Sequence, residues 1–532
     1  MGPVRQTALS QIGAETLLDR NFMPRPMLLG ALLLLGSCAS APPPRPPPAP
    51  ADAAGNDLLW LERVTYGPTS ATLAEYRRVG RSAFLDEQLN ARADQLPPEI
   101  AAQLEQLQIA HEDGADMLAR EQVESKRVNE MSASDDKAAA RKALNERGNK
   151  LSYEAQRREL LRAIYSPNQL REQMVGFWLN HFSVYQYKAN VRWLVGDYAE
   201  AAIRPHALGH FRDLVMATLE HPAMLQYLDN AQNAVEHVNE NYSRELMELH
   251  TLGVNGGYTQ RDVQELARIL TGAGIFHGGN GPHLRPEWQA LYRQKGGFEF
   301  NPYRHDFGPK VFLGTPIEGH GFPEIEQAVD LLVHQDACAH FVTRKIAIYF
   351  VADDPPASLT ERMAQTFKAT DGDIAAVLRT MFASSEFTAS LGGKFKDPMH
   401  YVVSTVRLAY DARPIVNAHP LINWLNGLGK APFGHQTPDG YPLTESGWAS
   451  SSQMTRRFEI ARAVGSGNAS LFDPEDGTAA APATGFPRLQ SRLYFDAVEP
   501  ILSKNTQVAL DQANSQQEWN TFLLASPELN YR

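Results

Sequence analysis

The sequence predicts a mainly α-helical protein, built as one large multi-helix domain with at most a small β-hairpin. Apolar residues recur three and four positions apart through most of residues 57–532, which is the spacing of one helix face. Strand-like alternation is confined to one short stretch. A composition of 43% hydrophobic and 21% charged residues over 532 positions is that of a globular chain.

Residues 1–37 form a predicted signal region. A basic residue, Arg25, precedes a ten-residue apolar stretch at 27–36, and small residues follow it up to Cys38. This is the pattern of a secretory signal, because a membrane-spanning helix needs about 20 apolar residues. Met23 starts the complete signal, so we expect translation to begin there.

The signal ends in Leu35-Gly36-Ser37-Cys38, which resembles the bacterial lipobox. The resemblance implies cleavage before Cys38 and its attachment to the membrane through lipid. The alternative is an ordinary signal, cleaved nearby, that leaves Cys38 free. Ala39 is not the aspartate that retains lipoproteins at the inner membrane, so lipidation implies the outer membrane of a Gram-negative cell envelope. Residues 38–56 are proline-rich and predict an extended tether.

The helical domain is predicted to begin near Asp57, with glycine breaks at Gly67 and Gly80 between its first helices. Residues 111–158 are rich in Glu, Lys, Arg and Ala and contain few large apolar residues. This composition predicts a charged helical arm of long exposed helices. The arm is either a solvated face or a surface that binds a protein partner.

Further along the chain, Thr259 and Asp262 have the spacing of a helix capping box, and Gly272 is placed to end that helix. FEFNPYRHDFGPKVFLG, residues 298–314, alternates and contains a Gly-Pro pair. It predicts the small hairpin, with His305 and Asp306 near its turn.

Charge and cysteine content exclude two classes of function. The formal charge of −11 argues against a nucleic-acid partner, because phosphate contacts need a basic face. If Cys38 is lipidated, Cys338 has no cysteine to pair with, and its apolar surroundings predict a buried core residue in place of a nucleophile. His-Glu-x-x-His, Gly-x-Ser-x-Gly, Walker and Cys-x-x-Cys motifs do not occur.

The segment NENYSRELMELHTLG, residues 239–253, is the strongest candidate for a site. At 100° per residue in a regular helix, Asn241, Arg244, Glu245 and Glu248 share one face beside an apolar arc. His250 points away from Glu248 in the same geometry. Glu245, Glu248 and Arg244 are therefore the candidate catalytic residues.

His181, Glu245, His305 and Asp306 lie in aromatic, apolar segments and together supply the nitrogen and oxygen ligands of a divalent metal. They are the candidate metal ligands. The alternative is a structural polar network, in which Arg244 neutralises the carboxylates. Glu240, Arg244 and Glu248 are also spaced as a surface ion-pair ladder.

Four motifs carry a resemblance over nearly all of residues 57–532: REQMVGFWLNHFSV, NENYSRELMELHTLGVNGGYTQRDVQELARILTG, HDFGPKVFLG and PDGYP. The chain resembles the bacterial family catalogued as domain of unknown function 1800. The resemblance implies a large, mostly helical exported domain, often encoded beside a second exported family whose product is a possible protein partner. It assigns no activity.

Two functions therefore stay open. The first is metal-assisted hydrolysis of an envelope or extracellular substrate. The second is a non-catalytic binding or assembly lipoprotein with a structural buried polar network.

Overall fold

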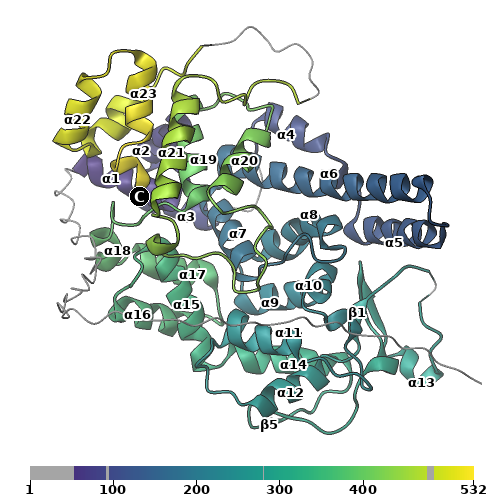
Figure 1. Cartoon of the computed structure of the whole chain (residues 1–532). Helices are drawn as coiled ribbons and strands as arrows, with labels where there is room; N and C mark the ends of the chain where they lie inside the picture. Colours follow the sequence, from purple (N-terminus) through teal and green to yellow (C-terminus); the bar gives the residue numbers. More distant parts are fainter. Residues whose placement is uncertain (1–52, 91–94, 280, 476–484) are drawn as a thin grey trace, which may run out of the picture. The chain divides into compact units, whose positions relative to one another are not determined.

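The computed structural model describes residues 53–90, 95–279, 281–475 and 485–532. The predicted signal region, Cys38 and nearly all of the proline-rich tether lie outside the described residues. Within them, no helix is both long enough and apolar enough to cross a membrane. The prediction of a mainly α-helical fold is confirmed (Figure 1).

The helices form one continuous hydrophobic core. The N-terminal half of the described chain contains these helices: α1 (Ala53–Val64), α2 (Ser70–Val79), α3 (Arg81–Leu89), α4 (Pro98–Glu105), α5 (Gly114–Glu130), α6 (Asp135–Tyr165), α7 (Gln169–His181), α8 (Val195–Asp197), α9 (Phe211–Leu219), α10 (Pro222–Tyr227), α11 (Asn241–Glu245) and α12 (Gln260–Ile269). The C-terminal half contains α13 (Pro286–Gln289), α14 (Phe322–Val333), α15 (Asp336–Phe350), α16 (Ala357–Ala369), α17 (Ile374–Phe382), α18 (Ser385–Ala389), α19 (Pro398–Tyr410), α20 (His419–Gly427), α21 (Ser451–Gly465), α22 (Lys504–Asp511) and α23 (Gln516–Leu524).

The predicted charged arm contains α5 and the first part of α6, which pack side by side as an antiparallel pair (Figure 1). Charged residues cover the first half of α6. Its second half is buried, from Leu151 to Ile164, and runs into the core. The prediction of exposed helices therefore describes only part of this stretch.

In the part of the chain that the structure describes, the β-structure consists of two small sheets. β3 (Phe298–Phe300) lies between β1 (Ala273–Ile275) and β2 (Arg293–Lys295), antiparallel to both. β4 (Val311–Phe312) and β5 (Thr315–Pro316) form a separate hairpin. The predicted hairpin with His305-Asp306 near its turn is wrong, because Phe298–Phe300 pairs with β1 and β2 instead of with residues 311–312.

Helix α7 is the element around which the candidate site is arranged. Nine of its side chains are buried, among them Trp178 and His181. A loop at residues 428–444 crosses its C-terminal end, where the Asn180 side chain binds the backbone of Tyr441 at both atoms, N–H to Oδ1 at 2.7 Å and Nδ2 to O at 3.0 Å. Gly440 makes this contact possible, since its φ is +75° and a β-carbon there would lie 2.1 Å from the Asn180 carbonyl oxygen.

Candidate functional site

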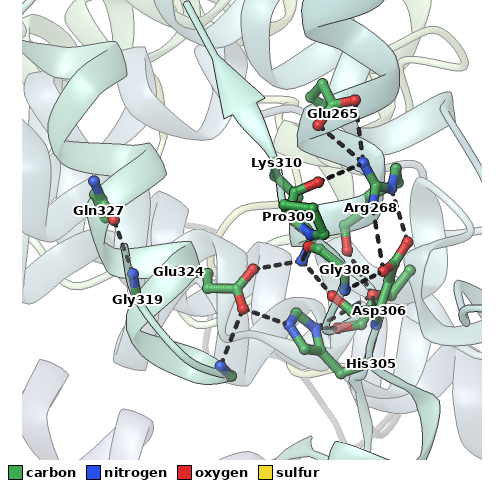
Figure 2. Close-up of polar contacts among 12 residues, drawn as sticks. Glu265, Arg268, His305, Asp306, Gly308, Pro309, Lys310, Gly319, Glu324 and Gln327 are labelled. Atoms are coloured by element: carbon green, nitrogen blue, oxygen red, sulfur yellow. Dashed lines mark hydrogen bonds and ion pairs between the residues drawn. The ribbon is translucent and has the colours of Figure 1, made fainter. Parts of the chain in front are cut away.

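The polar network around His305 joins the segment after β3 to helix α14 (Figure 2). His305 Nε2 lies 3.1 Å from Glu324 Oε1, and Lys310 Nζ lies 2.7 Å from Glu324 Oε2. The second nitrogen of His305 donates to the Thr271 carbonyl at 2.7 Å. Burial works to raise the pKa of Glu324, but its bonds to His305 and Lys310 hold it below the ordinary value. Each charge in this network is therefore compensated.

Asp306 lies beside this network, on the Arg268 side (Figure 2). Its Oδ2 accepts from Arg268 Nε at 2.7 Å, and Arg268 also binds Glu265 at 3.0 Å. Burial works to raise the pKa of Asp306, but Arg268 and the Gly308 N–H lower it overall. A carboxylate with these partners has an ordinary structural role.

The predicted metal site is therefore not formed. His305 and Asp306 are occupied by Glu324, Lys310 and Arg268, whereas His181 and Glu245 have other surroundings. Across the described part of the chain, no group of three or more His, Cys, Asp or Glu side chains is arranged to hold a metal ion. The sequence predicted that four suitable ligands share one site. In the fold, two of them, His305 and Asp306, have ion-pair partners of their own.

His181 instead adjoins His250. The ring centroids are 6.0 Å apart, and His181 Nε2 donates to the His250 carbonyl oxygen at 2.9 Å. Within the described residues, His181 Nδ1 and both ring nitrogens of His250 have no hydrogen-bond partner. Burial lowers the pKa of both rings, to about 3 for His250, and the positive charge of Lys345 lowers it further. Both imidazoles are therefore neutral at physiological pH.

The prediction that His250 points away from Glu248 assumed a regular helix, and the segment is not a regular helix there. The segment is α-helical only over α11, and Leu246–Thr251 forms a π-helix. In its last turn the Leu252 N–H bonds to the Met247 carbonyl, five residues back, at 2.8 Å. Each turn then holds an extra residue, so the 100° rotation no longer applies and His250 turns into the core.

Glu245 is half-buried, one turn before His250 on the same segment. Arg244 bonds to Glu240 at 2.9 Å and to Gln260 at 3.1 Å, so it makes no direct contact with Glu245. Neither Glu245 nor Glu248 has an ion-pair or hydrogen-bond partner within the described residues. Burial raises the pKa of Glu245, and the negative charge of Glu248 adds to the shift. The predicted ladder thus stops at Glu240 and Arg244.

Two further groups complete the site. Lys345 of α15 is half-buried against the Phe341 ring, 5.3 Å from its centroid, and has no ion-pair partner within the described residues. Burial lowers its pKa to about 8, a shift that Asp439 partly offsets. Burial works to raise the pKa of Asp439, but bonds from Thr437 at 2.6 Å and His435 at 3.1 Å lower it overall.

We name these side chains the carboxyl–imidazole cluster: His181, Glu245, Glu248, His250, Lys345 and Asp439. Asp439 interacts electrostatically with both Glu245 and Lys345, and Lys345 interacts with both imidazoles. The members come from α7, the α11–π segment, α15 and the loop at 428–444. Segments more than 250 residues apart in the sequence therefore meet in one place.

A family comparison covers the same region. The model of a family described as a protein of unknown function, DUF1800, matches residues 59–531. This range contains every helix and strand from α2 to α23. The chain belongs to the DUF1800 family. It matches no curated protein and no solved structure.

In this DUF1800 protein, three of the four motifs that carry the resemblance meet at the carboxyl–imidazole cluster. FWLNH supplies His181, NENYSRELMELH supplies Glu245, Glu248 and His250, and PDGYP supplies Asp439. The fourth, HDFGPKVFLG, forms the His305 network. The motifs therefore divide into a paired, structural network and a cluster whose charges are incompletely paired.

Two members of the cluster, Asp439 and Lys345, were not predicted as site residues from the sequence. Asp439 lies in PDGYP, one of the four motifs that carry the resemblance, but a Pro-Asp-Gly sequence indicates a turn and gives no sign of a site. Lys345 lies in an amphipathic helix with no motif around it, and nothing in its local sequence distinguishes it from a solvated lysine. The fold alone buries it beside two imidazoles.

The cluster gathers titratable groups with shifted pKa values. It combines a carboxyl with a raised pKa, a carboxylate with a lowered pKa, an amine with a pKa of about 8 and two neutral imidazoles. Perturbed titratable groups gathered in this way are typical of sites where protons are transferred.

Proposed function

We propose that this chain is an exported hydrolase that cleaves glycosidic bonds by acid–base chemistry, with Glu245 as the proton donor. The observation that carries the proposal is the opposite shift of two interacting carboxyl groups. Glu245 has a raised pKa and holds a proton more readily, while Asp439 has a lowered pKa and stays ionised. Pairs of this kind divide the acid and base roles between them in glycoside hydrolysis.

The proposed reaction adds water across the C–O bond. Glu245 gives its proton to the leaving oxygen as the bond breaks, and Asp439 accepts a proton from the water that attacks the carbon. Lys345 supplies a positive charge beside the carboxylates, which favours the ionised form of Asp439. The proposal draws on these side chains and does not include the metal ion that the sequence predicted.

The charge of the site supports an uncharged or cationic polymer as the substrate. Three carboxyl groups, Glu245, Glu248 and Asp439, face one lysine, so an anionic substrate is disfavoured. Tyr187 is 59% exposed, and its ring lies 5.5 Å from the ring of Tyr185. Between them, the Gln186 backbone N–H donates to the Phe433 carbonyl of the loop. Flat aromatic rings at the edge of this loop offer a surface on which sugar rings pack.

The test compares two glutamates on the same segment. We expect Glu245→Gln to lower the release of reducing ends from uncharged or cationic envelope glycans by about 100-fold or more. Glu240→Gln is the matched control, since Glu240 is already neutralised by Arg244 and its loss should change activity less than about twofold. Activity retained by Glu245→Gln, or absent from the wild type on every glycan tried, would contradict the proposal.

We also propose that the chain is lipid-anchored at Cys38 in the cell envelope, on the outer membrane of a Gram-negative bacterium. The lipobox and the absence of an aspartate at position 39 support this. The mature protein is expected to incorporate a fatty-acid label and to sediment with membranes. Cys38→Ser should remove the label and release the protein, whereas Cys338→Ser should do neither, since Cys338 is buried in the core.

A non-catalytic binding role is the second candidate, and the α5–α6 pair supports it. Val123 of α5 is 71% exposed on this charged surface. The product of a neighbouring exported-protein gene is the proposed partner. Val123→Lys would weaken its co-purification if this role holds, and Glu245→Gln would leave it unchanged.

A further inference from the structure

A second feature of the molecule, on another face of α7, is a partly open cavity of about 110 Å³. It lies between α6, α7, α19, α20 and the loop at 428–444. On α7 it touches Glu172, Gly176 and Asn180, which are four residues apart and so share one helix face. His181 and the rest of the carboxyl–imidazole cluster do not line it. We propose that this cavity binds a small, uncharged, mainly apolar molecule with one hydrogen-bonding group.

The lining explains the apolar part of the proposed ligand. Most of the wall is aliphatic or aromatic, from Leu160, Ala163, Phe177, Met399, Leu425 and Phe433. The volume suits one six-membered ring, because an engineered apolar cavity of about 150 Å³ in another protein binds benzene. Burying such a ring contributes favourable free energy in proportion to its apolar area.

The charged residues in the wall explain why the ligand is uncharged. Glu172 and Glu159 both bond to Arg204, at 2.7 Å each. Lys430 lies 3.1 Å from Asp397, whose buried carboxylate it neutralises. Since these charges already have counter-ions, an ionised ligand would lose its hydration and gain no unpaired opposite charge.

One polar group in the wall is available for a ligand. The Ser183 hydroxyl forms no hydrogen bond with any other described residue, although the residue is only 5% exposed. Asn180 is committed to the backbone of Tyr441, and the Tyr349 hydroxyl donates to the Gln173 carbonyl at 3.4 Å. A ligand hydroxyl or amide that pairs with Ser183 would satisfy it. Phenols, cyclic alcohols and small cyclic amides fit this description.

The test uses the full mature protein with phenol, cyclohexanol and benzoate as probes. We expect phenol and cyclohexanol to bind in calorimetry and to raise Tm, and benzoate, which carries a charge, to do neither. Ala163→Leu and Ala431→Leu place added volume in the cavity wall and should weaken phenol binding at least tenfold. Ala431 lies in the loop at 428–444, so Ala431→Leu still tests the inference if Ala163→Leu, in helix α6, does not fold.

Two controls separate this inference from the proposed hydrolase. Ala449→Leu adds the same volume on the exposed surface and should leave phenol binding unchanged. Glu245→Gln should also leave it unchanged, because Glu245 does not line the cavity. Equal binding of phenol to the wild type and both lining variants would overturn the inference. So would tighter binding of benzoate than of phenol, or no binding of either uncharged probe.

Discussion

Three histidines are buried with neutral rings: His181, His250 and His400. Burial lowers the pKa of each, to about 3 for His250 and for His400. His400 Nδ1 lies 2.8 Å from Asp397, but Arg532 on the other side of the ring also opposes protonation. Each of these side chains stays neutral in the folded state but titrates in the unfolded chain. The free energy of unfolding therefore depends on pH.

The sign of that dependence follows from the proton count. Unfolded histidine has a pKa of about 6.5, so below this pH the unfolded chain binds a proton at each of these positions and the folded chain does not. Stability from these residues is complete above about pH 6.5. As the pH drops below this value, the free energy of unfolding decreases by about 1.4 kcal/mol per pH unit for each histidine, until the folded-state pKa is reached.

Urea unfolding between pH 7 and pH 5 measures this slope. We expect His250→Gln to reduce the slope of the free energy of unfolding against pH by the contribution of one proton. This holds whatever effect the substitution has on stability at a single pH. His237→Gln is the control, because His237 is exposed and its loss should not alter the slope. An unchanged slope in His250→Gln would show that His250 is protonated in the folded state.

At the scale of secondary-structure elements, local signals predicted some features and missed others. The capping box was correct, since Thr259 and Asp262 bond reciprocally at the start of α12. The π-helix at Leu246–Thr251 was missed, because its sequence has the same apolar spacing as a regular helix. The π-helix departs from the regular geometry on which the expected direction of His250 was based, and His250 is buried beside His181.

Buried contacts of Glu324 join the segment before β4 to α14. Glu324 neutralises Lys310 and lies 3.1 Å from His305 Nε2 in a buried setting. Glu324→Gln leaves the Lys310 ammonium without a counter-ion, and removing one partner of a buried pair costs about 3–5 kcal/mol. We expect a loss of this size in the free energy of unfolding, measured with denaturant.

Glu326→Gln, two residues along the same helix, is the matched control. Its carboxylate pairs with Arg293 at the surface, where each side chain is more than a third exposed. Such pairs contribute about 0–1 kcal/mol. A loss in Glu324→Gln no larger than that of Glu326→Gln would mean that the His305 network does not stabilise the fold.

At the scale of the whole molecule, two buried arginines join distant parts of the chain. Arg63 of α1 donates to the Arg532 carbonyl at 2.6 Å, and Arg532 donates to Gln173 at 2.9 Å and to the Tyr349 carbonyl at 2.7 Å. The backbone of Arg532 also pairs with that of Lys394. α1, α7, α15 and the segment before α19 are thus held at one point.

Arg532→Ala is expected to lower the free energy of unfolding by about 3–5 kcal/mol, since it leaves several buried carbonyls and the Gln173 side chain without a donor. Arg456→Ala, at an exposed arginine of α21, should change it by no more than about 0.5 kcal/mol. Chemical denaturation measures both. Similar values for the two variants would show that Arg532 does not hold these segments together.

The sequence predicted the helical class and the family from signals spread over hundreds of residues. It placed Glu245 and His181 among the candidates but grouped them with His305 and Asp306, because ligand chemistry does not reveal which side chains already have partners. Lys345 and Arg532 are ordinary charged residues in sequence. Only the assembled core shows that Arg532 is buried and Lys345 half-buried, so no local pattern predicts their roles.

The bond between Arg63 and Arg532 also affects how the chain folds, because it joins residues 469 positions apart. Helix α1 cannot reach its final surroundings until residue 532 is free to fold back onto it. Contacts of such long sequence separation are slow to form, since a large loop must close before they contribute any free energy. When the chain is made or exported starting from its N-terminus, the apolar face of α1 therefore stays exposed longest. That face is where a chaperone that holds unfolded chains would be most useful.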